Sequence, residues 1–277
     1  MNTKKFNSRK TLNLSAFAFC IASLAFTSCS TSKDFNSDYP KVSLSPGFKI
    51  EKMVGGLTYP TSMTWDDQGK MYVAECGGAL NPQNLAPVRI LRVEPGKATE
   101  VVNLTGKGIN AAMVGMVWYK GAFYVTHRAD DWSGAVSKVT KEGLVTKLFD
   151  GILDSKAEHQ INDIKVGPDG KLYVSVGPAG NAGVVDLSIA PWIMKSPDVH
   201  TTPCKDIVLL GKNFKTPDFR SANPKDSVMT GAFVTFGTET RPGQVIKGAK
   251  KCGGSILKFD PNNAEATITM HAWGFRN

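Results

Sequence analysis

The sequence predicts an all-β protein, a β-propeller built from four-stranded blades. A hairpin pattern recurs, in which an apolar strand and a polar turn with glycine precede a second strand that carries a Tyr-Val pair. The pairs Tyr72-Val73, Tyr124-Val125 and Tyr173-Val174 are spaced by about 50 residues, which is typical of propeller blades and similar arrays. Two more strand-like segments follow each of the first two hairpins, and no long amphipathic helix interrupts them.

The predicted propeller occupies residues 46–277 and is partial. Its expected bounds are about 48–104, 108–152 and 158–271 for three blades, with a long insertion in the third at 178–251. A structureless loop of this length is uncommon in a compact domain, so we expect an elaborated loop that builds a binding site, or else a surface excursion. The strand candidates within and after it are residues 206–210, 232–236, 254–259 and 266–271.

About three blades plus the first residues of a fourth, at 272–277, leave strand edges and a blade face exposed. We therefore expect the front portion of a longer protein, with a truncated reading frame as one cause. The competing interpretation is a complete short protein closed by self-association.

Residues 1–28 have the features of a secretory signal. Basic residues precede an apolar run at 12–26, and Thr27-Ser28-Cys29 follows it. A cysteine in this place resembles a bacterial lipobox, so Cys29 is the expected lipidation site and residues 29–45 form a polar tether. We expect a lipoprotein anchored in the bacterial cell envelope, facing the periplasm or in the outer membrane, and plain secretion is the alternative.

Charge and cysteine content limit the partners. Removal of residues 1–28 takes four positive charges from the formal net charge of +9 and leaves +5, dispersed without the basic patch of a nucleic-acid-binding protein. An exported compartment permits disulfides, so Cys204 and Cys252 could staple the insertion, which leaves Cys76 as a buried thiol. No Cys/His spacing predicts zinc, and no metal ligands are assigned.

The stretch E-H-Q-I-N-D-I-K-V-G-P-D-G-K-L-Y-V-S-V-G at 158–177 places a polar cluster directly before the third hairpin. Its turn, Pro168-Asp169-Gly170, has residues suited to tight turns. His159 lies between Glu158 and Gln160, ahead of an inner strand. Because histidine titrates near neutrality, we expect chemistry at this place.

This stretch resembles the glucose/sorbosone dehydrogenase family, together with Gly115-Met116-Val117, Ser255-Ile256-Leu257 and the final Gly274-Phe275-Arg276-Asn277. Residues 204–214 are similar to an insertion in a sorbosone-dehydrogenase-like branch. The resemblance spans residues 46–277. It implies an exported six-bladed propeller, here incomplete, and oxidation of a sugar or polyol with pyrroloquinoline quinone (PQQ). Calcium could accompany the quinone, although its ligands are not identifiable.

By this resemblance His159 is the catalytic base that takes a hydroxyl proton while hydride leaves for the quinone. Glu158 would face the sugar, and Arg276 and Asn277 would contact the quinone as negative charge develops on it.

Two features depart from the family's pattern. Pro178 stands where the quinone enzymes commonly carry an aspartate that orients the histidine, and the register of Asp163 places it on the strand rather than opposite the ring. The later-blade lysine and arginines that hold the cofactor carboxylates would lie beyond Asn277. The chain therefore carries at most half a quinone site, and we do not expect the isolated chain to turn over.

Two other hypotheses remain open. One is a non-catalytic propeller lipoprotein that binds glycans or proteins, and the other is a calcium-dependent lactonase-type propeller. The second requires several inward carboxylates, which the sequence does not identify. His127 and Arg128, with Asp130 and Asp131, could form a metal or sugar subsite, but we interpret them as part of a solvated loop. Trp132 and Trp192 could stack on a sugar.

Overall fold

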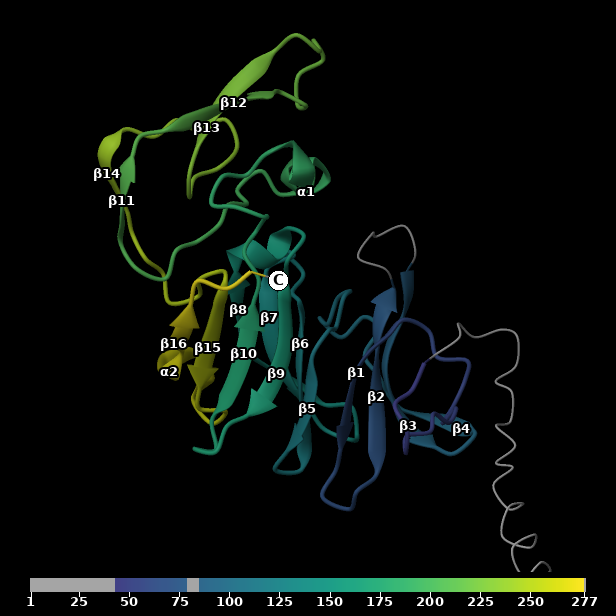
Figure 1. The fold of residues 1–277 in the computed structure, drawn as a ribbon. Helices are drawn as coiled ribbons and strands as arrows, with labels where there is room; N and C mark the ends of the chain where they lie inside the picture. Colours follow the sequence, from purple (N-terminus) through teal and green to yellow (C-terminus); the bar gives the residue numbers. More distant parts are fainter. Residues whose placement is uncertain (1–42, 79–84, 277) are drawn as a thin grey trace, which may run out of the picture. The chain divides into compact units, whose positions relative to one another are not determined.

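The computed structural model describes residues 43–78 and 85–276, and within them the fold is all-β. Three antiparallel sheets of four strands follow one another along the chain, as the sequence predicts (Figure 1). The strands of the first sheet are β1 (Pro60–Trp65), β2 (Met71–Gly78), β3 (Leu85–Glu94) and β4 (Lys97–Asn103). Those of the second are β5 (Met116–Tyr119), β6 (Ala122–Arg128), β7 (Gly134–Val139) and β8 (Val145–Ile152). Those of the third are β9 (Ile161–Val166), β10 (Leu172–Val176), β15 (Ser255–Phe259) and β16 (Thr269–Trp273).

Residues 43–51 are extended and contain one turn, closed by a hydrogen bond from the Phe48 N–H to the Ser45 carbonyl (3.2 Å). The predicted signal and the lipidation site Cys29 lie outside the described residues. None of the helices in the described part of the chain has the length and hydropathy of a membrane-spanning segment.

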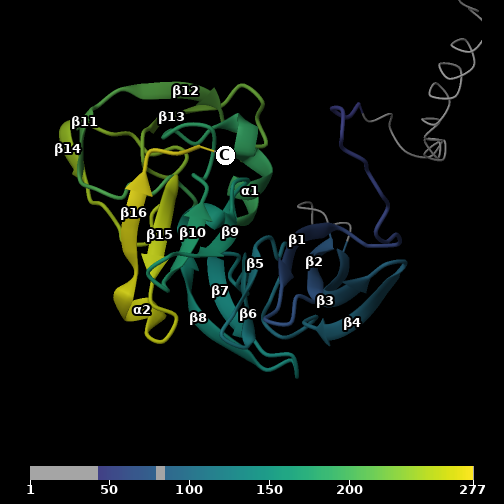
Figure 2. The same ribbon diagram turned by 60° about the horizontal axis from the view of Figure 1, so that its bottom comes forward.

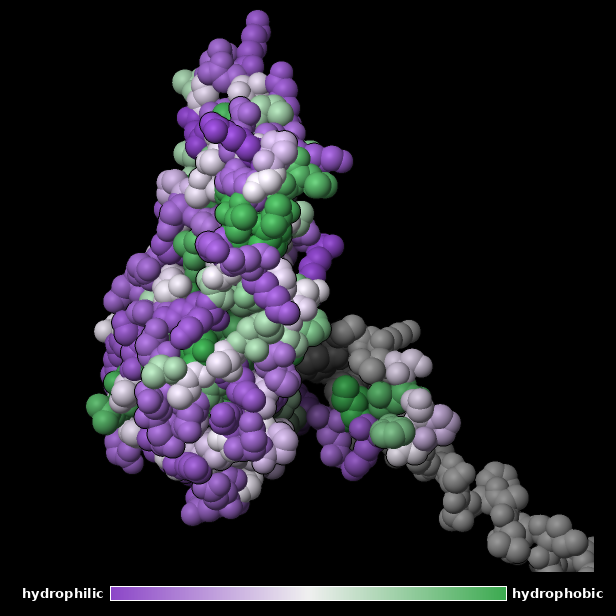
Figure 3. Space-filling view, turned by 90° about the vertical axis from the view of Figure 1, so that its left-hand side faces the viewer, coloured by the Kyte–Doolittle hydropathy of each residue, from purple (hydrophilic) through white to green (hydrophobic). Residues whose placement is uncertain are grey.

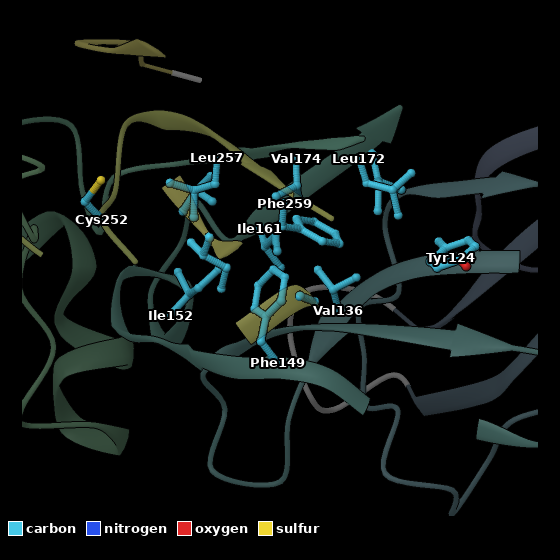
Figure 4. Close-up of a cluster of buried hydrophobic side chains, with 14 of the residues drawn as sticks. Tyr124, Val136, Phe149, Ile152, Ile161, Leu172, Val174, Cys252, Leu257 and Phe259 are labelled. Atoms are coloured by element: carbon cyan, nitrogen blue, oxygen red, sulfur yellow. The ribbon is translucent and has the colours of Figure 1, made fainter. Parts of the chain in front are cut away.

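The second strand of the middle sheet, β6, sends alternate side chains to two different cores. Phe123 and Val125 of β6 join Tyr72 and Ile90 of the first sheet in one buried cluster. Tyr124, between them in sequence, faces the other way into a second cluster. Its members come from the second and third sheets and include Val136, Phe149, Ile161, Leu172, Val174, Leu257 and Phe259 (Figure 4). Because strand side chains alternate between the two faces, the sheets stack face to face.

The innermost strands hold neighbouring sheets together. β1 packs beside β5, and β5 beside β9. The Thr64 hydroxyl accepts a hydrogen bond from the Trp118 N–H (2.9 Å), and the Thr126 hydroxyl donates to the Asn162 carbonyl. A Cβ at Gly115 would collide with that same carbonyl, so only glycine allows this close approach. The three sheets therefore form a propeller-like row, side by side in chain order (Figure 2).

A polar contact closes the interface between the first and second sheets at the end where β1 finishes. Asp66 accepts hydrogen bonds from the Tyr72 hydroxyl (3.0 Å) and from Lys141 Nζ (2.8 Å), and this ammonium lies 4.5 Å from the centre of the Trp118 ring. Burial would raise the pKa of Asp66, but these bonds and those from the backbone N–H groups of residues 68 and 70 hold it well below its usual range. The Lys141–Asp66 pair thus joins the second sheet to the first.

The insertion contains more structure than its sequence indicates. Its elements are η2 (Leu187–Ile189), α1 (Ala190–Lys195) and two hairpins, β11 (Ile207–Leu210) with β14 (Pro242–Ile246) and β12 (Asn213–Pro217) with β13 (Ser227–Gly231). It has a small core of its own, which includes Val185, Ile189, Ile193, Val199 and Phe236. Figure 3 shows hydrophobic residues grouped at the height of the insertion, and Val208 and Leu210 of β11 are exposed.

One strand prediction is wrong, and another is right about the strand but shifted in its bounds. Residues 232–236 form a turn, because Phe233 has a positive φ of 60° and Phe236 turns inward to stack on Phe219. Residues 266–271 begin in the short helix α2 (Ala264–Thr267), whose Ala264 packs into the core, and the last strand follows as β16.

Cys204 and Cys252 form a disulfide that spans 48 residues and fastens the base of both hairpins, while Cys76 is a buried free thiol.

Replacing both disulfide cysteines by serine should lower the free energy of unfolding by about 2–4 kcal/mol, because the unfolded chain regains the freedom of a long loop. Urea denaturation with and without reductant measures this. The wild type should respond to reductant and the double variant should not. A wild type equally stable after complete reduction would contradict the expectation.

Candidate functional site

One end of the third sheet gathers the sequence-predicted residues. The register aligns the first residue of β9, the last of β10, the first of β15 and the last of β16. The segments just outside these residues therefore meet at one end. They carry His159, ahead of β9, and Arg276, after β16.

A cavity of about 490 Å³ lies at this end, where the innermost strands begin. Its lining comes from the starts of β1 and β9, the end of β2 and the loop before β5: Tyr59, Pro60, Thr61, Cys76, Gly78, Ala112, Val114, Glu158, His159, Gln160 and Asn162. The structure thus brings the predicted base and the predicted sugar contact, His159 and Glu158, into one cavity.

The His159 ring is largely enclosed, with its side chain 16% exposed. Its Nδ1 is buried and has no hydrogen-bond partner among the described residues, and its Nε2 lies 3.9 Å from Glu158 Oε2. That distance makes an ion pair only when the imidazole is protonated. The ring can therefore accept a proton, and a carboxylate is in place to stabilise the resulting cation.

Gln160 and Thr61 add polar atoms to the wall. Gln160 is 3% exposed, and its Nε2 donates to the Ala112 carbonyl (3.3 Å), while its buried Oε1 has no partner in the described structure. The Thr61 hydroxyl donates to the Met113 carbonyl (2.8 Å) and keeps its lone pairs for an incoming donor. Both side chains suit the hydroxyl groups of a polar, uncharged ligand.

No described side chain takes the place of the orienting aspartate that the sequence lacks. Pro178 is buried and offers no acceptor side chain. Asp163 is exposed and pairs with Lys165 (2.7 Å), as its strand register predicts. Within the described residues, the position of His159 is fixed by its backbone rather than by a hydrogen bond to its ring.

Arg276 lies at the same end of the sheet but does not line the cavity. Its guanidinium donates to Asn181 Oδ1 (2.8 Å) at the start of the insertion. Asn277 lies outside the described residues. On the opposite wall, Cys76 donates to the Gly78 carbonyl (2.9 Å), and burial raises the pKa of its thiol.

The interpretation of His127 and Arg128 as part of a solvated loop is wrong. His127 and Arg128 end strand β6 and are buried, with the His127 ring bonded to Ser137 Oγ (2.8 Å). Burial lowers the pKa of His127 to about 4. The Trp132 and Trp192 rings lie against the Arg128 guanidinium, with ring centres 5.4 and 4.7 Å from it.

Arg128 and Asp154, which no sequence pattern singles out, support the loop that carries His159. Arg128 donates to the carbonyls of Ser155 (3.0 Å) and Ala157 (2.7 Å), and burial lowers its pKa to about 10. Asp154, in the short helix η1 (Leu153–Lys156), accepts from the Ala179 and Thr202 N–H groups (both 3.1 Å). A Cβ at Gly253 would collide with the Asp154 carboxyl group, so the C-terminal end of the insertion also packs against it.

No three acidic, histidine or cysteine side chains in residues 43–78 and 85–276 gather closely enough to hold a metal ion.

Neither a protein-family model nor a curated protein matches the sequence. Among solved structures, the chain is similar to an oxidoreductase of the glucose dehydrogenase type from Thermus thermophilus, with 22% identity over 48% of this chain and 40% of that one, and a TM-score of 0.38. It is also similar to the PQQ-bound aldose sugar dehydrogenase of Streptomyces coelicolor, with 14% identity over 77% and 78% of the two chains and a TM-score of 0.40.

A periplasmic gluconolactonase from Pseudomonas aeruginosa is similar at 12% identity, over 77% of this chain and 71% of that one, with a TM-score of 0.32. The glucose and aldose dehydrogenases are of the class that the sequence resembles. The chain spans less than half of the Thermus protein, and at these TM-scores the likeness carries no argument about its chemistry.

Burial raises the pKa of Asp154 from its ordinary value of 3.8 to about 7, against the effect of its hydrogen bonds to residues 202 and 179. The folded state then holds a proton that the unfolded state releases, so stability falls as the pH rises from about 4 to about 7. Asp154→Asn cannot ionise. Its loss of unfolding free energy between about pH 5 and pH 8 should be smaller than that of the wild type by roughly 2 kcal/mol.

Chemical denaturation at both pH values measures this difference. The lowered pKa of His127 makes its own contribution to stability rise with pH, and this contribution is equal in the two proteins. Subtracting the pH dependence of one protein from that of the other therefore removes it. Parallel pH dependence in the two proteins would contradict the expectation.

Proposed function

We propose that the chain is part of a sugar-oxidising protein of the dehydrogenase type, in which the cavity binds the sugar and His159 takes a proton from its hydroxyl group. One observation carries this proposal. An enclosed imidazole with an unpartnered ring nitrogen shares a cavity with Glu158 and Gln160, and the cavity opens at the end of the sheets where the innermost strands begin. The resemblance of the sequence supports the same reaction class.

The chemistry of the lining suits a neutral polyol. No lysine or arginine lines the described cavity, so it offers no partner for a phosphate or carboxylate group on the substrate. The Glu158 carboxylate and the Gln160 carbonyl oxygen accept hydrogen bonds from hydroxyl groups, and Pro60 and Val114 supply apolar contact for a ring face.

The proton transfer follows from the position of His159. A bound hydroxyl group donates to the imidazole, which takes the proton as the carbon beside it is oxidised. The imidazolium that forms is stabilised by Glu158, whose Oε2 lies 3.9 Å from Nε2. Because nothing bonds the ring in advance, the substrate hydroxyl completes its orientation.

The described residues do not fit the whole quinone. PQQ carries carboxylate groups, whereas the cavity has no cation, and Arg276 is bonded to Asn181 instead of facing the cavity. When bound, the quinone would accept the hydride. The cations that hold it would come from the remaining half of a six-bladed ring, which the three sheets do not form. That half would belong either to a longer parent chain or to a second copy.

His159→Ala should leave aldose binding within a few-fold of wild type and lower dye-linked oxidation by about 10²–10⁴-fold, the usual contribution of a general base. Binding is measured on the chain itself by calorimetry. Oxidation is measured with PQQ, calcium and a redox dye, on the chain and on any longer form with the later blades. His200→Ala is the matched control, because His200 bonds to the Asp198 carbonyl and does not line the cavity.

Aldose binding by wild type with neither quinone absorbance nor dye reduction in any form would favour a glycan-binding propeller. An absence of aldose binding would overturn the proposal itself.

We also propose that the protein acts outside the cytoplasm, attached to the bacterial cell envelope through a lipid on Cys29. The Cys204–Cys252 disulfide supports an oxidising compartment.

Cys29→Ser should move the protein from the membrane fraction to the soluble periplasmic fraction, because a lipid anchor is then absent. Cell fractionation and intact-mass measurement of the N-terminal peptide test this. An unmodified Cys29 in the mature wild type would contradict the anchor.

A further inference from the structure

The first two strands pair in an equivalent register in all three sheets. The two faces of one sheet can therefore be compared with those of the others, residue by residue. The equivalent pairs across the first two strands are Met63/Val73, Met116/Val125 and Ile164/Val174. These pairs define what we call the leading face of each sheet. The opposite, trailing face carries the repeated tyrosine: Tyr72, Tyr124 or Tyr173.

Each interface between sheets joins a trailing face to the next leading face. Trp118, on the leading face of the second sheet, stacks on Tyr72, with ring centres 6.3 Å apart and planes 9° apart. Tyr72 is 3% exposed in this interface, and Met116 is fully buried. Tyr124 is 4% exposed in the interface with the third sheet, where Val166 takes the place of the tryptophan.

Two faces of the row are left uncovered by residues 43–78 and 85–276. On the leading face of the first sheet, Met63 and Trp65, the equivalents of Met116 and Trp118, are 58% and 51% exposed. On the trailing face of the third sheet, Tyr173 is partly exposed. Its hydroxyl donates to Asp169 Oδ2 (3.1 Å) as that of Tyr72 donates to Asp66, and Lys258 Nζ lies 5.7 Å from its ring centre.

We propose that two copies of this chain cover each other's open faces, with Met63 and Trp65 of one copy packed on Tyr173 of the other. The interface repeats the Trp118–Tyr72 contact already present within the chain. Two such contacts related by a twofold axis close the assembly, because each copy offers one leading and one trailing face. The closed assembly has two equal rows of three sheets.

The open leading face has room for this contact on its innermost strand. The segment before β1 lies beside the other strands of the first sheet. There the Met53 carbonyl accepts from the Gly96 N–H (2.8 Å), and the Thr58 N–H donates to the Glu75 carboxylate in β2 (2.6 Å). Val73, Leu91 and Val93 are buried there, so the exposed apolar area is confined to β1. The contacts between sheets within the chain are made by the innermost strands too.

Sedimentation velocity of the full chain carrying Cys29→Ser, without quinone or sugar, tests the proposal independently of the proposed function. We expect a dimer at micromolar concentration. Trp65→Glu and Tyr173→Glu should each raise its dissociation constant by at least 100-fold. The far-UV circular dichroism spectrum should be unchanged, because both side chains are solvent-accessible in the single chain. Leu144→Glu, at a 66% exposed turn position, is the control and should leave the dimer intact.

A cross-linking experiment tests which face of one copy contacts which face of the other. A short bis-maleimide should link a Trp65→Cys chain to a Tyr173→Cys chain, and should link neither variant to itself. A monomer at every concentration, which would be the result if later blades of a longer chain cover these faces, overturns the proposal. A dimer that resists both glutamate substitutions, or a Trp65→Cys chain that links to itself, also overturns it.

Discussion

The structure depends on one constraint, which is that the second sheet is apolar on both faces. Strand β6 shows the cause, because Phe123 and Val125 need cover from the first sheet while Tyr124 needs cover from the third. A four-stranded sheet of this kind exposes too much apolar surface to be stable alone. Stacking of the sheets is therefore obligatory. The equivalent register of the first two strands in each sheet decides which side chains contact the next sheet.

That constraint also places the site. Where the faces of the sheets are used for packing against each other, polar chemistry has to lie at the strand ends, in the connecting loops. The common direction of β1, β5 and β9 brings the start of each to the same end, where the loops before them enclose the cavity. Gly115 allows the second of these loops to approach the third closely, so the cavity wall and the interface between sheets are built by the same backbone contact.

Local patterns predicted the parts of the molecule that depend on neighbours in sequence. The Tyr-Val repeat and the glycine turns place most strands of the three sheets, and the polar cluster ahead of β9 places His159 and Glu158 in the cavity. The errors arise where distant residues decide. Residues 232–236 have the composition of a strand, but Phe236 finds its partner in Phe219, and Arg128 resembles a loop residue until Trp192 of the insertion covers it. No local signal marks Asp154, whose partners lie 25 and 48 residues away.

The burial of Arg128 links the insertion to the candidate base. A guanidinium enclosed without a carboxylate is costly to desolvate, and here two indole faces and two carbonyls replace water. Those carbonyls belong to Ser155 and Ala157, so the contacts that make the charge tolerable also hold the backbone leading to His159. No described residue forms a hydrogen bond with the His159 ring, so the position of the ring relies on this backbone. An insertion that seemed peripheral in the sequence therefore acts on the site, because the tryptophan it supplies keeps Arg128 in place.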